Sequence, residues 1–86
     1  MASIPDSVRK AWKAKPGATV HVIVRVEGDL EERAAALGDR GYHIQRTLRL
    51  ARRLALRCSA EQALQLSRFR WITEIEPDQP IRLFGG

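Results

Sequence analysis

The segment Thr19-Val-His-Val-Ile-Val-Arg-Val-Glu27 decides the fold of this 86-residue chain. A valine stands at every second position from Val20 to Val26, so all four share one face of an extended strand. The side chains of His21, Ile23 and Arg25 fall on the opposite face. β-Branched residues at period two are typical of a strand with one buried face. We therefore expect a core strand over 19–27.

The first helix is predicted to follow this strand directly. Asp29 stands at the N-cap position, and Glu32 three residues later completes a signature similar to a capping box. Apolar residues then recur at helical spacing over 30–39. Gly38 and Gly41 are both suitable residues for ending the helix.

Two further alternating segments predict a β-hairpin over 42–58. The inward face of its first strand is expected to carry Ile44, Leu48 and Leu50. Arg46 interrupts that apolar face, so we expect a twist or a bulge near it. After a short turn, the alternation resumes with Leu54, Leu56 and Cys58.

A second capping box and a last strand complete the pattern. Ser59 and Gln62 predict the start of a second helix, and 72–76 reads as a strand that ends at Pro77. The order β-α-β-β-α-β with right-handed crossovers predicts an α+β, ferredoxin-like fold: a four-stranded antiparallel sheet with two helices on one face. We divide the chain into a basic, partly ordered lead-in segment (1–18), this domain (19–78) and an extended tail (79–86).

The other face of the sheet is expected to be open and flat enough to receive a partner. We expect it to carry His21, Ile23, Arg25, Gln45, Thr47, Arg49, Arg53, Ala55 and Arg57. Of these, Ile23, Thr47 and Ala55 are its candidate contact residues.

The charge of the chain favours a nucleic acid as that partner. The net charge is +5, and twelve of the fifteen basic residues are Arg. However, an RNA-recognition domain with this strand order stacks bases on aromatic residues of its central strands, and 19–27 and 53–58 contain none. A basic ferredoxin-like nucleic-acid-binding or protein-interaction module using Arg49, Arg53 and Arg57 remains the alternative function.

Catalysis, cofactors and metals are not expected. One cysteine (Cys58) and two strand histidines (His21 and His43) are too few for a convincing nucleophile–base or metal site, and no glycine-rich phosphate loop is present. No segment approaches the roughly 20 apolar residues of a membrane span. The residues after Met1 lack the apolar core of a signal peptide. The expected location is cytoplasmic if Met1 is the native start, or extracellular if the chain is excised from a secreted precursor.

Four segments, taken in order, resemble the propeptide of subtilisin-type serine proteases and the related stand-alone proteinase inhibitors. They are His21-Val-Ile-Val-Arg-Val26, Gly41-Tyr-His-Ile-Gln-Arg46, Ser59-Ala-Glu-Gln-Ala-Leu64 and Ile72-Thr-Glu-Ile-Glu-Pro-Asp78. The last is similar to the closing signature of that family, in which two apolar residues precede Glu-x-Asp. The resemblance covers about 19–84 and depends on the order and spacing of short segments.

The resemblance implies an inhibitor, or a propeptide-type intramolecular chaperone, of a subtilisin-like serine protease. In that family the open sheet face packs on two parallel surface helices of the enzyme. The acidic pair, here Glu76 and Asp78, caps the N-termini of these helices, where unpaired N–H groups and the helix dipole favour carboxylates. The chain would be a monomer when free.

The resemblance also implies a role for the tail. The tail would enter the substrate cleft in extended form and pair with edge strands of the protease. The tail residues expected to contact the protease are Ile81, Arg82, Leu83 and Phe84. Phe84 would occupy the primary specificity pocket and Ile81 the apolar site three residues earlier, whereas Gly85-Gly86 would extend past the scissile position.

Overall fold

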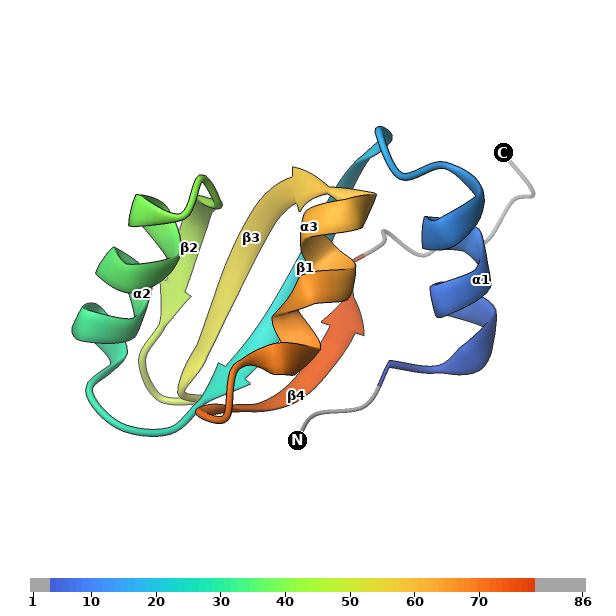
Figure 1. Ribbon diagram of the computed structural model, residues 1–86. Coiled ribbons are helices and arrows are strands. Elements are labelled where there is room, and N and C mark those ends of the chain that lie inside the picture. The colour runs from blue at the N-terminus through green and yellow to red at the C-terminus, as the bar shows by residue number, and fades with distance from the viewer. Residues whose placement is uncertain (1–3, 79–86) are drawn as a thin grey trace, which may run out of the picture.

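Four antiparallel strands form one sheet in the order β2-β3-β1-β4, in a computed structural model that describes residues 4–78. The elements are α1 (Asp6–Ala14), β1 (Thr19–Val26), α2 (Leu30–Asp39), β2 (His43–Leu48), β3 (Arg53–Ser59), α3 (Ala60–Gln65), a short 3-10 turn η1 (Leu66–Arg68) and β4 (Ile72–Pro77). α2 and α3 cover the same face of the sheet, α2 over β2 and α3 over β1 and β3 (Figure 1). The predicted α+β, ferredoxin-like fold is thereby confirmed.

The core lies between the sheet and the helices. Val22, Val24 and Val26 of β1 are at most 1% exposed. They share a hydrophobic cluster with Leu54 and Leu56 of β3, which stand beside them in the sheet. The helices contribute fully buried residues to the same cluster, including Leu37, Ala63 and Leu66. The valine face of β1 is therefore the face that the helices cover.

Side-chain caps fix where both of these helices begin. The carboxylate of Asp29 accepts hydrogen bonds from the backbone N–H groups of Glu31 (2.9 Å) and Glu32 (3.1 Å). At α3 the capping box is complete, because the Ser59 hydroxyl accepts from Gln62 N–H (3.1 Å) and the Gln62 side chain accepts from Ser59 N–H (3.0 Å). These bonds satisfy backbone donors that have no partner within a helix.

Gly41, rather than Gly38, ends α2. Gly41 N–H donates to the carbonyl of Gly38 (3.0 Å), and Tyr42 N–H donates to the carbonyl of Leu37 (3.1 Å). This pair of bonds is the Schellman arrangement, which requires a left-handed residue at the Gly41 position. Gly41 has φ +94°, a conformation that costs an L side chain free energy.

A β-bulge in β2 changes which residues of that strand face the helices. Ile44 pairs with Leu56, but the next pair joins Arg46 to Ala55, so Gln45 and Arg46 together stand opposite one residue. After the bulge, Thr47 pairs with the buried Leu54 and therefore lies on the helix-bearing face, not on the open face where uninterrupted alternation put it. By the same shift, Leu48 stands opposite Arg53 on the open face and does not join the core.

The N-terminal helix α1 packs against α3 at the side of the domain (Figure 1). Trp12 and Ile4 are each 4% exposed and belong to the core cluster, with Val8 packed against it. The remaining surface of α1 is largely charged and exposed. The helix is thus held by a few apolar side chains, which extend the core beyond the two crossover helices.

Gly38, inside α2, and Gly41, just after it, provide a matched test of which glycine ends the helix. Gly41→Ala is expected to lower the free energy of unfolding by about 1–2 kcal/mol, because φ stays positive and the new Cβ would lie 3.2 Å from Gln62 Nε2. Gly38→Ala meets nothing within 4 Å and is expected to raise it by about 0.5–1 kcal/mol. Urea unfolding would measure the free energy of unfolding of both variants. Equal effects of the two changes would contradict the assignment of Gly41 as the residue that ends α2.

Two buried groups that lose a proton at alkaline pH, the Cys58 thiol and the Tyr42 hydroxyl, make the fold less stable as the pH rises. Burial raises the pKa of the Cys58 thiol from 9.0 to about 11. Burial, with a smaller contribution from Cys58, raises the pKa of Tyr42 from 10.0 to about 12, against the lowering effect of Arg40. Both groups therefore ionise at a lower pH in the unfolded chain. Their contribution to stability is complete below about pH 9 and is lost as the pH rises towards 12.

The Cys58→Ala variant is expected to show a weaker decline in unfolding free energy between pH 9 and 11, because its unfolded state has no thiol to ionise. Urea unfolding at a series of pH values would give the two curves. The same slope in wild type and variant over that range would show that Cys58 does not cause the decline.

Candidate docking face

The face of the sheet opposite the helices carries three rows of side chains that cross all four strands. Each row begins with a carboxylate on β4 and continues across β1, β3 and β2. The rows are Asp78–His21–Arg57–His43, Glu76–Ile23–Ala55–Gln45/Arg46 and Glu74–Arg25–Arg53–Leu48. We call this surface the open face.

Two of the residues proposed from the sequence form the apolar centre of the open face. Ile23 and Ala55 stand opposite each other in the middle row. Ala55 is only 1% exposed, because it is a small residue on an inner strand among longer side chains. Ile23 is half-buried. The third proposed residue, Thr47, is absent from this centre because of the bulge, and Leu48 is present on the face instead.

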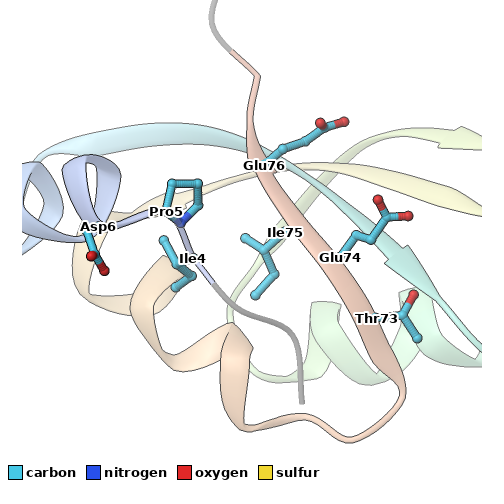
Figure 2. Close-up of a pocket in the computed structure, with 7 residues that line it drawn as sticks. All are labelled: Ile4, Pro5, Asp6, Thr73, Glu74, Ile75 and Glu76. Carbon is cyan, nitrogen blue, oxygen red and sulfur yellow. The ribbon is translucent and has the colours of Figure 1, made fainter.

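The strand β4 supplies the acidic edge of the open face. Glu76 pairs with Ile23 and Glu74 with Arg25, so both carboxylates project from the same side of β4. Figure 2 shows this arrangement, with Ile75 pointing to the opposite side, towards Ile4. Between β4 and the segment 4–6 lies a hollow of about 620 Å³, and Glu74 and Glu76 stand at its border. The acidic edge of the open face thus borders this hollow.

Arg53 holds the two glutamates in place from across the sheet. Its Nη1 lies 2.9 Å from Glu76 Oε1 and its Nη2 lies 3.6 Å from Glu74 Oε1, while Arg25 Nη1 lies 3.2 Å from the same Glu74 oxygen. The side chains are between about one third and one half exposed, so each pair is worth only about 0–1 kcal/mol. The effect of the network is therefore chiefly to orient the carboxylates.

Within residues 4–78 these contacts use only Oε1 of Glu76. The carboxylate is about half exposed, and Oε2 accepts no bond from the described residues. Glu76 can thus keep its bond to Arg53 and still accept a hydrogen bond from a docking partner.

Asp78 belongs to the same edge. Its backbone N–H donates to the carbonyl of His21 (2.8 Å), which continues the β1–β4 ladder by one residue past Pro77. By alternation from Glu76, the Asp78 side chain lies on the open-face side. Ile81, Arg82, Leu83 and Phe84, which were proposed from the family resemblance, lie outside the described residues.

The three arginines of the alternative function do not form one surface. Arg53 and Arg57 lie on the open face, but Arg49 makes a salt bridge to Glu31 of α2, on the helix-bearing side. Among residues 4–78, the open face also carries no Phe, Tyr or Trp side chain. Trp12 and Tyr42 are buried, and Phe69 and Trp71 lie before β4, where Arg40 and Arg33 stack on their rings. The aromatic residues on which RNA-recognition domains stack bases thus have no Phe, Tyr or Trp counterpart on this face, whose ring side chains are those of His21 and His43.

Two histidines, His21 and His43, stand on either side of Arg57 in the first row of the open face. His21 Nδ1 lies 3.0 Å from Gln45 Oε1, which ties β1 to the bulge of β2 across β3. In residues 4–78 no three histidine, cysteine or acidic side chains gather in a way that could hold a metal ion. None of the helices in the same range is long and apolar enough to cross a membrane.

Sequence reasoning did not assign four residues to the open face: His43, Arg46, Leu48 and Glu74. Glu74 has the same parity as Glu76 and Asp78, so alternation alone could have placed it there. Arg46 and Leu48 required the exact position of the bulge, which the interrupted apolar pattern indicated only approximately.

A comparison of the chain with known protein families, curated proteins and solved structures finds no match.

Proposed function

We propose that this protein is an inhibitor, or a propeptide-type folding assistant, of a subtilisin-like serine protease. The observation that carries the proposal is the placement of Glu76 and Asp78 on the open face, beside the apolar pair Ile23 and Ala55 and at the point where the chain continues into 79–86. The order of family-like segments in the sequence supports it independently.

The proposed docking follows from the chemistry of the face. A helix N-terminus presents unpaired N–H groups and the positive end of its dipole, and both favour a carboxylate acceptor. Two carboxylates on one strand, with an apolar centre beside them, suit a surface where two parallel helices begin. Arg53 pre-orients Glu76, so less conformational freedom is lost when the complex forms.

The residues after Asp78 supply the inhibitory contact in this proposal. An extended segment that leaves the sheet edge next to the docked face would enter the substrate cleft and pair with the edge strands of the enzyme. The apolar side chains of Ile81 and Phe84 would fill two of its pockets. A folding assistant with the same contacts would act by binding the native protease more tightly than its unfolded chain.

Deletion of 81–86 tests the inhibitory role of the tail. We expect the full chain to inhibit at least one member of a panel of purified subtilisin-like proteases, and the truncated chain to lose inhibition by at least a hundredfold. The deletion removes none of the helices and strands that the structure describes, so we expect circular dichroism and urea unfolding to be unchanged. Equal inhibition by both chains, or none by the full chain across the panel, would refute the proposal.

The acidic pair is tested by the double variant Glu76→Ala plus Asp78→Ala. We expect dissociation from the inhibited protease to be about tenfold faster, because two charge–helix contacts of about 0.5–1 kcal/mol each are lost. The matched control is Asp39→Ala plus Glu61→Ala, which removes two exposed charges from α2 and α3. Surface plasmon resonance gives both rates, and equal dissociation of the two variants would exclude the capping role.

A further inference from the structure

Two arginines at the far end of the open face have no acidic partner within residues 4–78. Arg46 is the second residue of the β2 bulge, and Arg57 stands between His21 and His43 in the first row. Both are exposed, and neither makes a salt bridge there. This distinguishes them from Arg25, Arg49 and Arg53, which all pair with glutamates.

The open face therefore has two electrically different ends. Among residues 4–78, its three carboxylates lie along the edge formed by β4, Glu74 and Glu76 on the strand and Asp78 directly after it. Arg53 and Arg25 already pair with the two glutamates. Arg46 and Arg57 lie on β2 and β3, with the apolar pair Ile23 and Ala55 between Arg46 and the acidic edge. The sheet fixes this separation, so a partner that covers the whole face meets both ends at once.

We call the part of the open face that carries Arg46 and Arg57 the basic end. A partner that covers it changes the solvation of both arginines. Removing the water around an arginine on docking is strongly unfavourable unless an acceptor replaces that water, and a carboxylate can do so with two parallel hydrogen bonds. Glu74 and Glu76 already pair with Arg25 and Arg53, and no carboxylate of residues 4–78 forms a salt bridge with Arg46 or Arg57. When this end of the face is covered, both arginines therefore need an acceptor from the partner.

We propose that the protease surface covered by the open face carries carboxylates opposite Arg46 and Arg57, and that these contacts determine which subtilisin-like proteases the protein binds. The inference rests on the proposed function and adds the charge of the partner surface to it. The basic end attracts such a surface during approach and disfavours proteases with lysine or arginine there.

A protein surface fits this face better than a nucleic acid does. A phosphate backbone attracted by Arg46 and Arg57 would also meet Glu74, Glu76 and Asp78 on the same sheet, and these carboxylates repel it. A protein can instead present acidic groups at one end and helix N-termini at the other.

The test uses the full-length double variant Arg46→Glu plus Arg57→Glu. Its control is Arg9→Glu plus Lys10→Glu, which changes the net charge equally at exposed positions of α1, away from the sheet. Association and dissociation rates are measured with a protease that the wild-type chain inhibits, at about 20 mM and about 300 mM salt. Circular dichroism establishes that both variants fold.

We expect the Arg46/Arg57 variant to associate about tenfold more slowly at low salt and to lose the acceleration that low salt gives the wild type. The control should stay within about threefold of wild type. Replacing the facing acidic residues of the protease by lysine should restore the rate of the variant and slow that of the wild type.

Three results would overturn the inference. Unchanged rates for the Arg46/Arg57 variant would show that the basic end faces solvent in the complex. Equal slowing of both variants would assign the effect to net charge alone. Binding of a fluorescent oligonucleotide that is lost in the Arg46/Arg57 variant would show that these two arginines bind nucleic acid instead. These results differ from failure of the proposed function, in which the wild-type chain itself inhibits no protease.

Discussion

Burial of the valine face of β1 is the interaction on which the rest of the structure depends. β1 is paired on both sides, to β3 and β4, so the orientation of its side chains sets the orientation of theirs. Once Val22 and Val24 are buried, His21, Ile23 and Arg25 must point the other way. The side of the sheet on which Arg53, Glu74 and Glu76 lie follows from this choice, although these residues are far from β1 in the sequence.

Local signals in the sequence were sufficient for the four strands and for α2 and α3, but not for α1 or for the lateral contacts between elements. The Asp29 and Ser59 caps located the starts of α2 and α3, because capping involves residues only two or three positions apart. The ion pairs of Arg53 join residues 21 and 23 positions apart, and their formation required the register of β4 on β1. Such contacts depend on tertiary pairing, which periodicity does not reveal.

The bulge in β2 shows how one residue limits prediction of a site. The pattern around Arg46 indicated an irregularity, yet a shift of one position exchanges the faces of every later residue in the strand. Thr47 consequently joined the helix side, and Leu48 joined the open face. A candidate surface inferred from alternation is thus most secure on inner strands without interruptions, as Ile23 and Ala55 were.

Pro77 gives the outer edge of the sheet a further property. Asp78 N–H points towards β1, so by alternation the backbone of Pro77 points away from the sheet, where its ring nitrogen offers no hydrogen. β4 is also an edge strand whose alternate residues are Glu74 and Glu76. A second copy that approached this edge would miss a ladder bond and meet like charges. A copy that paired along this edge would therefore extend the sheet with one hydrogen bond fewer than an uninterrupted strand provides.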